Sequence, residues 1–299
     1  MSNFTLYAVS VVIWGSTWLV IKFQLGQVSP IVSVGWRFSL AALMLLIYSA
    51  LRRRSLRFSV REHGWIALQG VLLFGINYIG VYLSEQYLVS GLVAVVFSLV
   101  VFTNALGMRL FFGLPIRLTA VLAATLGVTG VALIFGRELL SVRTSAGNEL
   151  RGLLLALAAT LVASLGNMVA TRNHRHGLPV MQVNAWSMLY GAVFVLVVAL
   201  AGGEPLSFEF SWPYLASLLF LALFGSALAF GAYLTLMGRI GADRAAYTAV
   251  AIPIVALLLS TAFEQLRWHL ETFTGVAACI GGIALTLRRR PIQIRTDGQ

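Results

Sequence analysis

Long apolar stretches, separated by short polar or turn-forming segments, make up almost the whole chain. A helix needs roughly 20 apolar residues to cross the hydrocarbon layer of a membrane. Runs of about that length lie at 4–24, 30–51, 64–84, 88–108, 116–136, 150–172, 180–201, 213–236, 243–263 and 269–288. The pattern predicts an all-α integral membrane protein with ten transmembrane helices and short loops. The first run lacks a basic leading segment and a small-residue cleavage site, so we interpret it as a span rather than a signal peptide.

The composition supports a membrane protein. Of 299 residues, 59% are hydrophobic and only 10% are charged, and the mean hydropathy is +0.90. Soluble globular proteins carry about 45–50% apolar and about 25% charged residues. This chain has too few charges to cover a water-exposed surface. Its single cysteine, Cys279, excludes an internal disulfide and a cysteine metal cluster.

The charge is lopsided, with 21 basic residues against 10 acidic ones and a formal net charge of +11. In a soluble protein this surplus would favour a nucleic-acid partner. Assigned to alternate loops, however, 15 basic residues fall on the N-terminal side and 5 on the other, with Arg37 left inside the second run. The positive-inside rule therefore predicts that both termini are cytoplasmic. The basic surplus thus indicates orientation in a lipid bilayer, which is the expected partner in place of a nucleic acid.

The two halves of the chain share a weak internal similarity at a shift of about 150 residues. The aligned pairs include Pro30 with Pro179, Phe74-Gly75 with Phe224-Gly225, and Gly130 with Gly282. Because each half contains an odd number of runs, the second half would enter the membrane from the opposite side. We therefore predict two inverted five-helix repeats, at 1–145 and 146–299. Such repeats are typical of secondary transporters; the alternative is chance similarity among apolar helices.

Several short motifs resemble those of EamA-type members of the drug/metabolite transporter superfamily. They are Trp14-Gly15-Ser16 followed by Lys22, then Arg37, the stretch from Tyr247 to Pro253, and Gly281-Gly282. The chain differs from the family pattern at Val101, where a fourth-helix proline is common. It also differs at Phe112, which lies opposite Glu264 and replaces a glutamate found in many members.

The resemblance covers the whole chain and, more narrowly, extends to aromatic amino acid exporters of that superfamily. It implies export of amino acids or other small metabolites across the bacterial cytoplasmic (inner) membrane. No cofactor and no metal are expected. Two fused halves remove the need for a dimer, so we expect a functional monomer.

Ionisable side chains within a span are costly, by about 2.5–3.5 kcal/mol, and are therefore functional candidates. Arg37 lies seven residues into the second run. It is predicted to hold a substrate carboxylate or to pair with Glu85; alternatively, it extends back to the membrane interface. Lys22 and Glu85 lie at the same outer level, either as gating groups or as solvated helix ends.

One face of the third run is predicted to line a substrate cavity. Tyr78, Tyr82 and Glu85 recur at i, i+4 and i+7, which places them on one helical face with Asn77 beside them. Phenols, an amide and a carboxylate suit a wet cavity better than lipid. The alternative is an interfacial tyrosine belt.

The remaining cavity candidates are Trp14 in the first run and, in the second half, Ser164, Asn167, Trp186 and Tyr247. For the second-half group, helix packing through hydrogen bonds is the favoured interpretation. Pro253 lies in the middle of the ninth run and removes one backbone hydrogen bond. It is predicted to kink that helix beside a gate, unless it is simply tolerated.

No Asp or Glu falls in the middle third of a predicted span, and the sequence has no P-loop and no H-E-x-x-H motif. His174 and His176 are interpreted as part of a solvated turn. We therefore predict a secondary transporter that works by alternating access and moves a small molecule down its gradient. The alternatives are a transporter of other metabolites or drugs, a lipid-active membrane enzyme, or a membrane scaffold.

Overall fold

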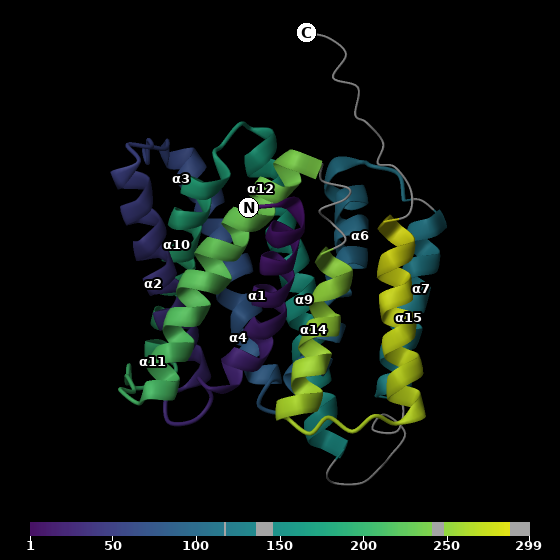
Figure 1. Cartoon of the computed structure of the whole chain (residues 1–299). Coiled ribbons are helices and arrows are strands. Elements are labelled where there is room, and N and C mark those ends of the chain that lie inside the picture. The colour runs from purple at the N-terminus through teal and green to yellow at the C-terminus, as the bar shows by residue number, and fades with distance from the viewer. Residues whose placement is uncertain (117, 136–145, 241–247, 288–299) are drawn as a thin grey trace.

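The computed structural model is a bundle of helices that run roughly along one axis (Figure 1). It describes residues 1–116, 118–135, 146–240 and 248–287. Within these residues the chain forms helices, turns and short extended loops but no strand. Six helical stretches are long and apolar enough to cross a membrane, and four shorter apolar helices accompany them. The chain is therefore an all-helical, multi-span membrane protein, as the apolar runs predict.

Fifteen helical segments are described. In the first half they are α1 (Asn3–Lys22), α2 (Pro30–Leu51), α3 (Val60–Gly70), η1 (Val71–Ile76), α4 (Asn77–Ser84), α5 (Ser90–Phe97), α6 (Val100–Phe112) and α7 (Leu118–Ile134). In the second half they are α9 (Ala146–Arg175), α10 (Val180–Ala201), α11 (Trp212–Leu219), η2 (Phe220–Leu228), α12 (Ala229–Ile240), α14 (Thr248–Phe263) and α15 (Leu270–Leu287).

Local sequence explains where several helices begin and end. Ser59 and Glu62 form a capping box at the start of α3, in which each side chain accepts a hydrogen bond from the other residue's backbone N–H. Pro30 occupies the first position of α2, where its missing N–H costs nothing. Gly113 ends α6 with a φ of 70°, a conformation that a side chain would disfavour.

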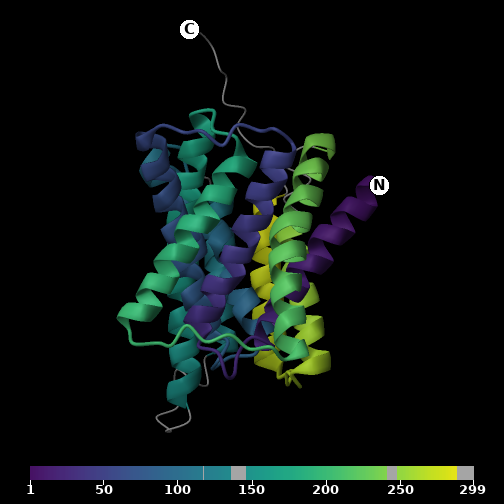
Figure 2. The same cartoon turned by 90° about the vertical axis from the view of Figure 1, so that its left-hand side faces the viewer.

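The helices pack as recurring pairs. α2 packs along α10 (Figures 1 and 2), and α7 packs along α15 at one edge of the bundle (Figure 1). α1 contacts α12 and α14, while α9 contacts α4 and α6. The buried side chains form one large apolar cluster around α2, η1, α4, α10 and η2. A second one lies around α5, α7, α14 and α15. These pairs fix the frame in which the polar groups described below are held.

Two π-helical segments interrupt otherwise α-helical spans. η1 lies between α3 and α4, and η2 lies between α11 and α12. Phe74-Gly75 falls in η1 and Phe224-Gly225 falls in η2, the same two pairs that the internal alignment superimposes. A π-helical turn shifts the backbone register and often accompanies a functional site. Within η2, the carbonyl of Gly225 accepts a hydrogen bond from the Trp14 indole at 3.1 Å.

Glycines allow α7 and α15 to approach closely. A Cβ at Gly130 would lie 2.4 Å from the carbonyl oxygen of Gly275, and one at Gly275 would lie 2.5 Å from that of Gly130. A Cβ at Gly282 would lie 2.6 Å from the carbonyl oxygen of Ala123. The neighbouring Gly281 has open space around its missing Cβ. Small residues at such contacts are a common basis of helix association in membranes.

Gly281 and Gly282 therefore provide a matched test of this packing. Gly282→Val should push α15 away from α7, and overpacking of this kind costs about 1–3 kcal/mol. We expect a lower apparent melting temperature in detergent for Gly282→Val and an almost unchanged value for Gly281→Val. Equal effects of the two substitutions would contradict the described α7–α15 contact.

Candidate functional site

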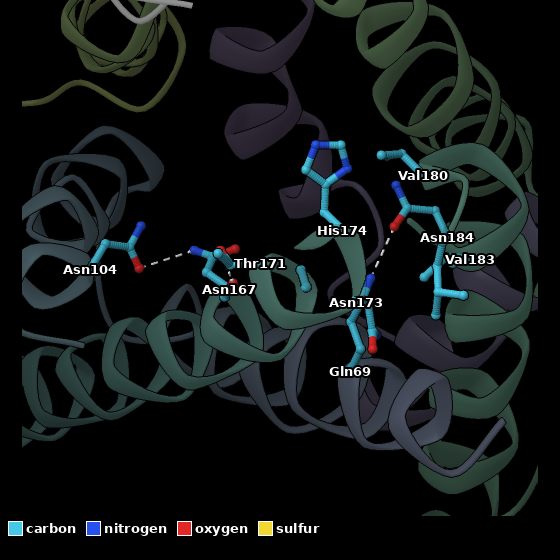
Figure 3. A pocket seen from close by; sticks show the side chains of 11 residues that line it. Gln69, Asn104, Asn167, Thr171, Asn173, His174, Val180, Val183 and Asn184 are labelled. Atoms are coloured by element: carbon cyan, nitrogen blue, oxygen red, sulfur yellow. Dashed lines mark hydrogen bonds between the residues drawn. The ribbon is translucent and has the colours of Figure 1, made fainter. Parts of the chain in front are cut away.

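A cavity of about 440 Å³ lies among α3, α6, α9 and α10. Figure 3 shows that its labelled side chains come from all four helices. The lining contains five carboxamides together with a threonine, a histidine and four apolar residues. These are Gln69, Asn104, Asn167, Ala170, Thr171, Asn173, His174, Leu178, Val180, Val183 and Asn184. We call this space the carboxamide cavity.

The carboxamides are positioned by hydrogen bonds to one another. Gln69 is buried between two of them: its Nε2 donates to Asn184 Oδ1 at 3.1 Å, and its Oε1 accepts from Asn173 Nδ2 at 3.0 Å. On the other side of the cavity, Asn167 Nδ2 donates to Asn104 Oδ1 at 3.3 Å. Because a buried polar group is costly unless it has a partner, these pairs stabilise the arrangement of α3, α6, α9 and α10.

Some of the carboxamide groups remain available to a ligand. Within the part of the chain that the structure describes, Nδ2 of Asn184 and Nδ2 of Asn104 donate no hydrogen bond to protein, and Oδ1 of Asn167 accepts none. An amide can donate to a carboxylate and accept from an ammonium or hydroxyl group, and it carries no charge itself. The cavity is therefore chemically suited to a small polar molecule without net charge.

The cavity lies towards one end of the bundle. This is the end where α2 finishes, α3 begins and α9 is followed by α10, at the top of Figure 1. The loop between α2 and α3 carries Arg52, Arg53 and Arg54 there, and the exposed Arg175 lies at the end of α9. We call this the arginine-rich end and the other the arginine-poor end. His174 borders the cavity and is exposed, so the cavity reaches the surface at the arginine-rich end.

At the arginine-poor end, polar contacts join helices that are far apart in the sequence. Lys22, the last residue of α1, donates to the backbone carbonyls of Glu85 and of Leu88, the latter at 2.6 Å, and pairs with Glu264 Oε1 at 3.5 Å. Glu264 also accepts from Ser90 at the start of α5, from both its backbone N–H and its hydroxyl.

Ser260 of α14 completes this group. Its hydroxyl donates to Glu264 Oε2 at 2.5 Å and accepts from the backbone N–H of Gly91. The Ser260 hydroxyl also lies 3.0 Å from the Ser90 hydroxyl. We call Lys22, Ser90, Ser260 and Glu264 the Lys22 cluster. It ties α1, α5 and α14 together at the arginine-poor end, where Ser90 and Ser260 are fully buried.

A third polar group surrounds Arg37, between the two ends. The guanidinium is buried, donates to the Tyr82 hydroxyl at 3.4 Å, and lies over the rings of Tyr78 and Phe38, 4.7 and 5.2 Å from their centres. The Tyr82 hydroxyl in turn donates to Gln24 Oε1 at 2.6 Å. Cation–π contacts and one phenol thus take the place that a carboxylate partner would occupy.

The structure brings some of the sequence-predicted site residues together. Arg37, Tyr78 and Tyr82 meet, as the shared helical face predicted for the tyrosines. Trp14 lies nearby, because its indole donates to the carbonyl of Gly225. A Cβ at Gly225 would lie 3.7 Å from Arg37 Nη2. Of the predicted cavity residues, Asn167 lines the carboxamide cavity.

The other predicted residues lie apart from the carboxamide cavity. Asn77 is buried and donates to the Leu73 carbonyl of its own span, and Ser164 is buried in α9. Trp186 donates to the Leu56 carbonyl and stacks on Tyr190 near the arginine-rich end. Pro253 is buried within α14, which continues past it. Tyr247 lies outside the described residues.

Sequence reasoning missed most of the carboxamide cavity and part of the Lys22 cluster. Gln69, Asn104 and Asn184 are amides inside apolar runs, and that signal could have marked them as candidates. Glu264 follows directly after an apolar run, where a solvated carboxylate is the ordinary expectation. Among the described residues, no three His, Cys, Asp or Glu side chains gather as a metal site.

Comparison with known proteins identifies the family. The profile of the EamA-like transporter family matches the chain twice, at residues 2–136 and at residues 150–288. The chain belongs to the EamA-like transporter family. As an EamA-like protein with several apolar spans, it is a multi-pass membrane protein of a transporter family.

Individual relatives agree with this family. The chain is 31% identical over 255 residues to the uncharacterized inner membrane transporter YedA of Escherichia coli, with 84% of this chain and 79% of YedA covered. It is 27% identical over 261 residues to the uncharacterized transporter YoaV of Bacillus subtilis, covering 86% and 85% of the two chains. A solved crystal structure shares the fold with a TM-score of 0.66 at 17% identity, covering 97% of this chain and 99% of the other.

The difference between the two ends can be tested by thiol labelling. Asn184 is the fifth residue of α10 and lines the carboxamide cavity, whereas Ser33 is the fourth residue of α2, is fully buried, and lies towards the arginine-poor end. In a Cys279→Ala background, we expect Asn184→Cys to react readily with a water-soluble maleimide and Ser33→Cys to react slowly. Equal rates in the folded protein would contradict the one-ended cavity.

Proposed function

We propose that this EamA-like protein is a secondary transporter that exports neutral amino acids or similar small zwitterionic metabolites across the cytoplasmic membrane. One observation carries the proposal: a polar cavity reaches the surface at the arginine-rich end, while the Lys22 cluster ties the helices together at the opposite end. A transporter caught with one side open has this arrangement. The substrate is moved unchanged, without covalent chemistry.

The chemistry of the carboxamide cavity supports a zwitterionic substrate. The free Nδ2 groups of Asn104 and Asn184 would donate to the substrate carboxylate, and Oδ1 of Asn167 would accept from its ammonium group. Because the amides are neutral, they favour a ligand whose own charges cancel. Arg37 faces Tyr78, Phe38 and Tyr82 in this conformation, so we propose that it meets substrate only after the helices have rearranged.

The aromatic side chain of an amino acid would require an apolar or aromatic surface. Among the residues that the structure describes, the lining of the carboxamide cavity includes no Phe, Tyr or Trp. A preference for aromatic amino acids therefore rests on the sequence resemblance and on Tyr78 and Tyr82, which lie beside Arg37. Export of other metabolites or drugs is the second candidate, and the same cavity would serve it.

We propose that two inverted five-helix halves, 1–145 and 146–299, produce alternating access. The family profile matches once in each proposed half. The helix contacts also repeat between the halves. The first helix of each half packs on the fourth span of the other half, as α1 does on α14 and α9 does on α6. The second helices, α2 and α10, pack on each other, and so do the fifth, α7 and α15. A π-helical segment lies in the third span of each half. Exchange of the two halves' conformations would close the carboxamide cavity and open the arginine-poor end.

The positive-inside rule gives the orientation that we propose. The arginine-rich end, with both termini, faces the cytoplasm, so the cavity would load substrate from inside. A single chain contains both halves and would function as a monomer. Substrate would move down its own concentration gradient.

Counterflow in proteoliposomes tests the function. Vesicles preloaded with unlabelled neutral amino acids should accumulate the labelled ones transiently, and a panel of aromatic, small neutral and charged amino acids would define the range. We expect uptake of neutral members that exceeds uptake by protein-free vesicles. Absence of counterflow for all members of the panel, in preparations that remain folded, would overturn the amino-acid proposal.

The role of the cavity can be tested by a pair of matched substitutions. Asn184→Leu removes a cavity donor and should weaken the apparent affinity roughly 2- to 10-fold, the equivalent of about 0.5–1.5 kcal/mol for one hydrogen bond. Thr125→Val removes a hydroxyl that is exposed on α7 and bonded to the Val121 carbonyl of its own helix, so transport should not change. An unchanged KM for Asn184→Leu would remove the cavity from the substrate path.

A further inference from the structure

Glu85 is a buried carboxylate whose side chain has no hydrogen-bond partner. The residue follows α4 at the arginine-poor end and is 1% exposed. Neither of its carboxylate oxygens has a partner within the part of the chain that the structure describes. The backbone carbonyl of the same residue, by contrast, accepts from Lys22. The unpaired side chain therefore sits directly beside the Lys22 cluster.

The nearby cations are directed at other groups. Lys22 Nζ is bound by two backbone carbonyls and paired with Glu264. Arg37 lies over two aromatic rings and donates to the Tyr82 hydroxyl. Both cations act on the Glu85 carboxylate through space, but neither donates a hydrogen bond to it.

The other titratable and charged groups around Glu85 come from several segments. Tyr78 and Tyr82 lie on its own helix, Lys22 comes from α1, Arg37 from α2, and Glu264 follows α14. From α9, Arg151 covers the ring of Tyr87, 5.1 Å from its centre. Glu264 takes the hydrogen bonds of Ser90 and Ser260 and the ion pair with Lys22. Glu85 receives none of these contacts.

An ionised carboxylate without donors is expensive to keep away from water, whereas a neutral carboxyl group is much less so. The closed arginine-poor end therefore favours the protonated form of Glu85. If that end opens, the Lys22 cluster separates, water reaches Glu85, and the released Lys22 ammonium becomes available to the ionised carboxylate. The two conformations thus differ in how strongly they bind one proton.

We propose that Glu85 is a proton-binding site that couples closure of the arginine-poor end to uptake of one proton from that side. The carboxylate takes the proton from water outside that end as the helices close, and returns it to the same water when they open. The orientation and the two conformations rest on the proposed function. Acidification at the arginine-poor end then stabilises the conformation described here, and alkalinity favours opening.

The test uses the full chain with Cys279→Ala and a reporter thiol at Leu88→Cys. Leu88 is 5% exposed beside the Lys22 cluster, so a water-soluble maleimide reaches this position only when the arginine-poor end opens. Gln27→Cys lies in an exposed loop at the same end and corrects for the intrinsic pH dependence of the thiol reaction. The corrected labelling rate should rise roughly tenfold or more between about pH 5 and about pH 9.

Substitutions at Glu85 identify the titrating group. Glu85→Gln imitates the protonated form permanently, so labelling of Leu88→Cys should stay slow and independent of pH. Glu85→Asp keeps a titratable group and should retain the pH dependence with a shifted midpoint. Glu204→Gln, which removes a carboxylate from the loop between α10 and α11, should leave the profile unchanged.

A pH profile that is flat in the parent chain, or that persists in Glu85→Gln, would overturn the proton-binding site. Glu264→Gln weakens the Lys22 ion pair and should accelerate labelling while the pH dependence remains. This result would distinguish the role of Glu264 from that of Glu85. The labelling experiment does not require transport. If counterflow fails but the Glu85-dependent pH profile is intact, the transport proposal alone is overturned. If counterflow occurs but labelling shows no Glu85-dependent pH profile, the proton site alone is overturned.

Discussion

The ammonium group of Lys22 connects three separate segments of the chain at the arginine-poor end. It binds the carbonyls of Glu85 and Leu88, which lie between α4 and α5, and it pairs with Glu264 after α14. Hydrogen bonds that involve a charged group are worth about 1.5–3 kcal/mol each, roughly twice a neutral one. Separation of these helices would break all of these contacts together.

The two ends of the bundle use their polar side chains differently. In an apolar bundle, most polar side chains find partners or face water. The carboxamides do both, because they bond to one another and leave single groups free for a ligand. Arg37 lies between the two ends, where its guanidinium lies over two aromatic rings and donates to the Tyr82 phenol. A substrate that advances beyond the cavity would therefore have to compete with these contacts, which links substrate position to the state of the helices.

Much of the fold could be predicted because the thickness of a bilayer sets the length of an apolar span. The runs at 30–51 and 180–201 coincide with α2 and α10. The α9 helix, Ala146–Arg175, extends beyond the predicted 150–172 because polar residues at both of its ends continue the helix outside the apolar run. The π-helical segments carry no distinctive composition, so only the internal alignment of Phe74-Gly75 with Phe224-Gly225 hinted that the two places correspond.

The candidate site was less predictable. The spacing of Tyr78 and Tyr82 correctly placed them on one side of a helix, but whether that side faces water or Arg37 depends on helix packing, which spacing does not encode. The carboxamides come from four helices and are separated by up to 115 positions, as Gln69 and Asn184 are. Glu85 and Glu264 occupy similar places after their helices. Among the described residues, however, the Glu85 carboxylate has no hydrogen-bond partner, whereas the Glu264 carboxylate accepts four hydrogen bonds.

We propose that transport requires the arginine-poor end to open. The hydroxyls of Ser90 and Ser260 lie 3.0 Å apart across that end, so cysteines at both positions are within reach of a disulfide. In a Cys279→Ala background, the oxidised Ser90→Cys, Ser260→Cys protein should bind substrate but show no counterflow, and reduction should restore it. Full counterflow by the oxidised, cross-linked protein would contradict the account.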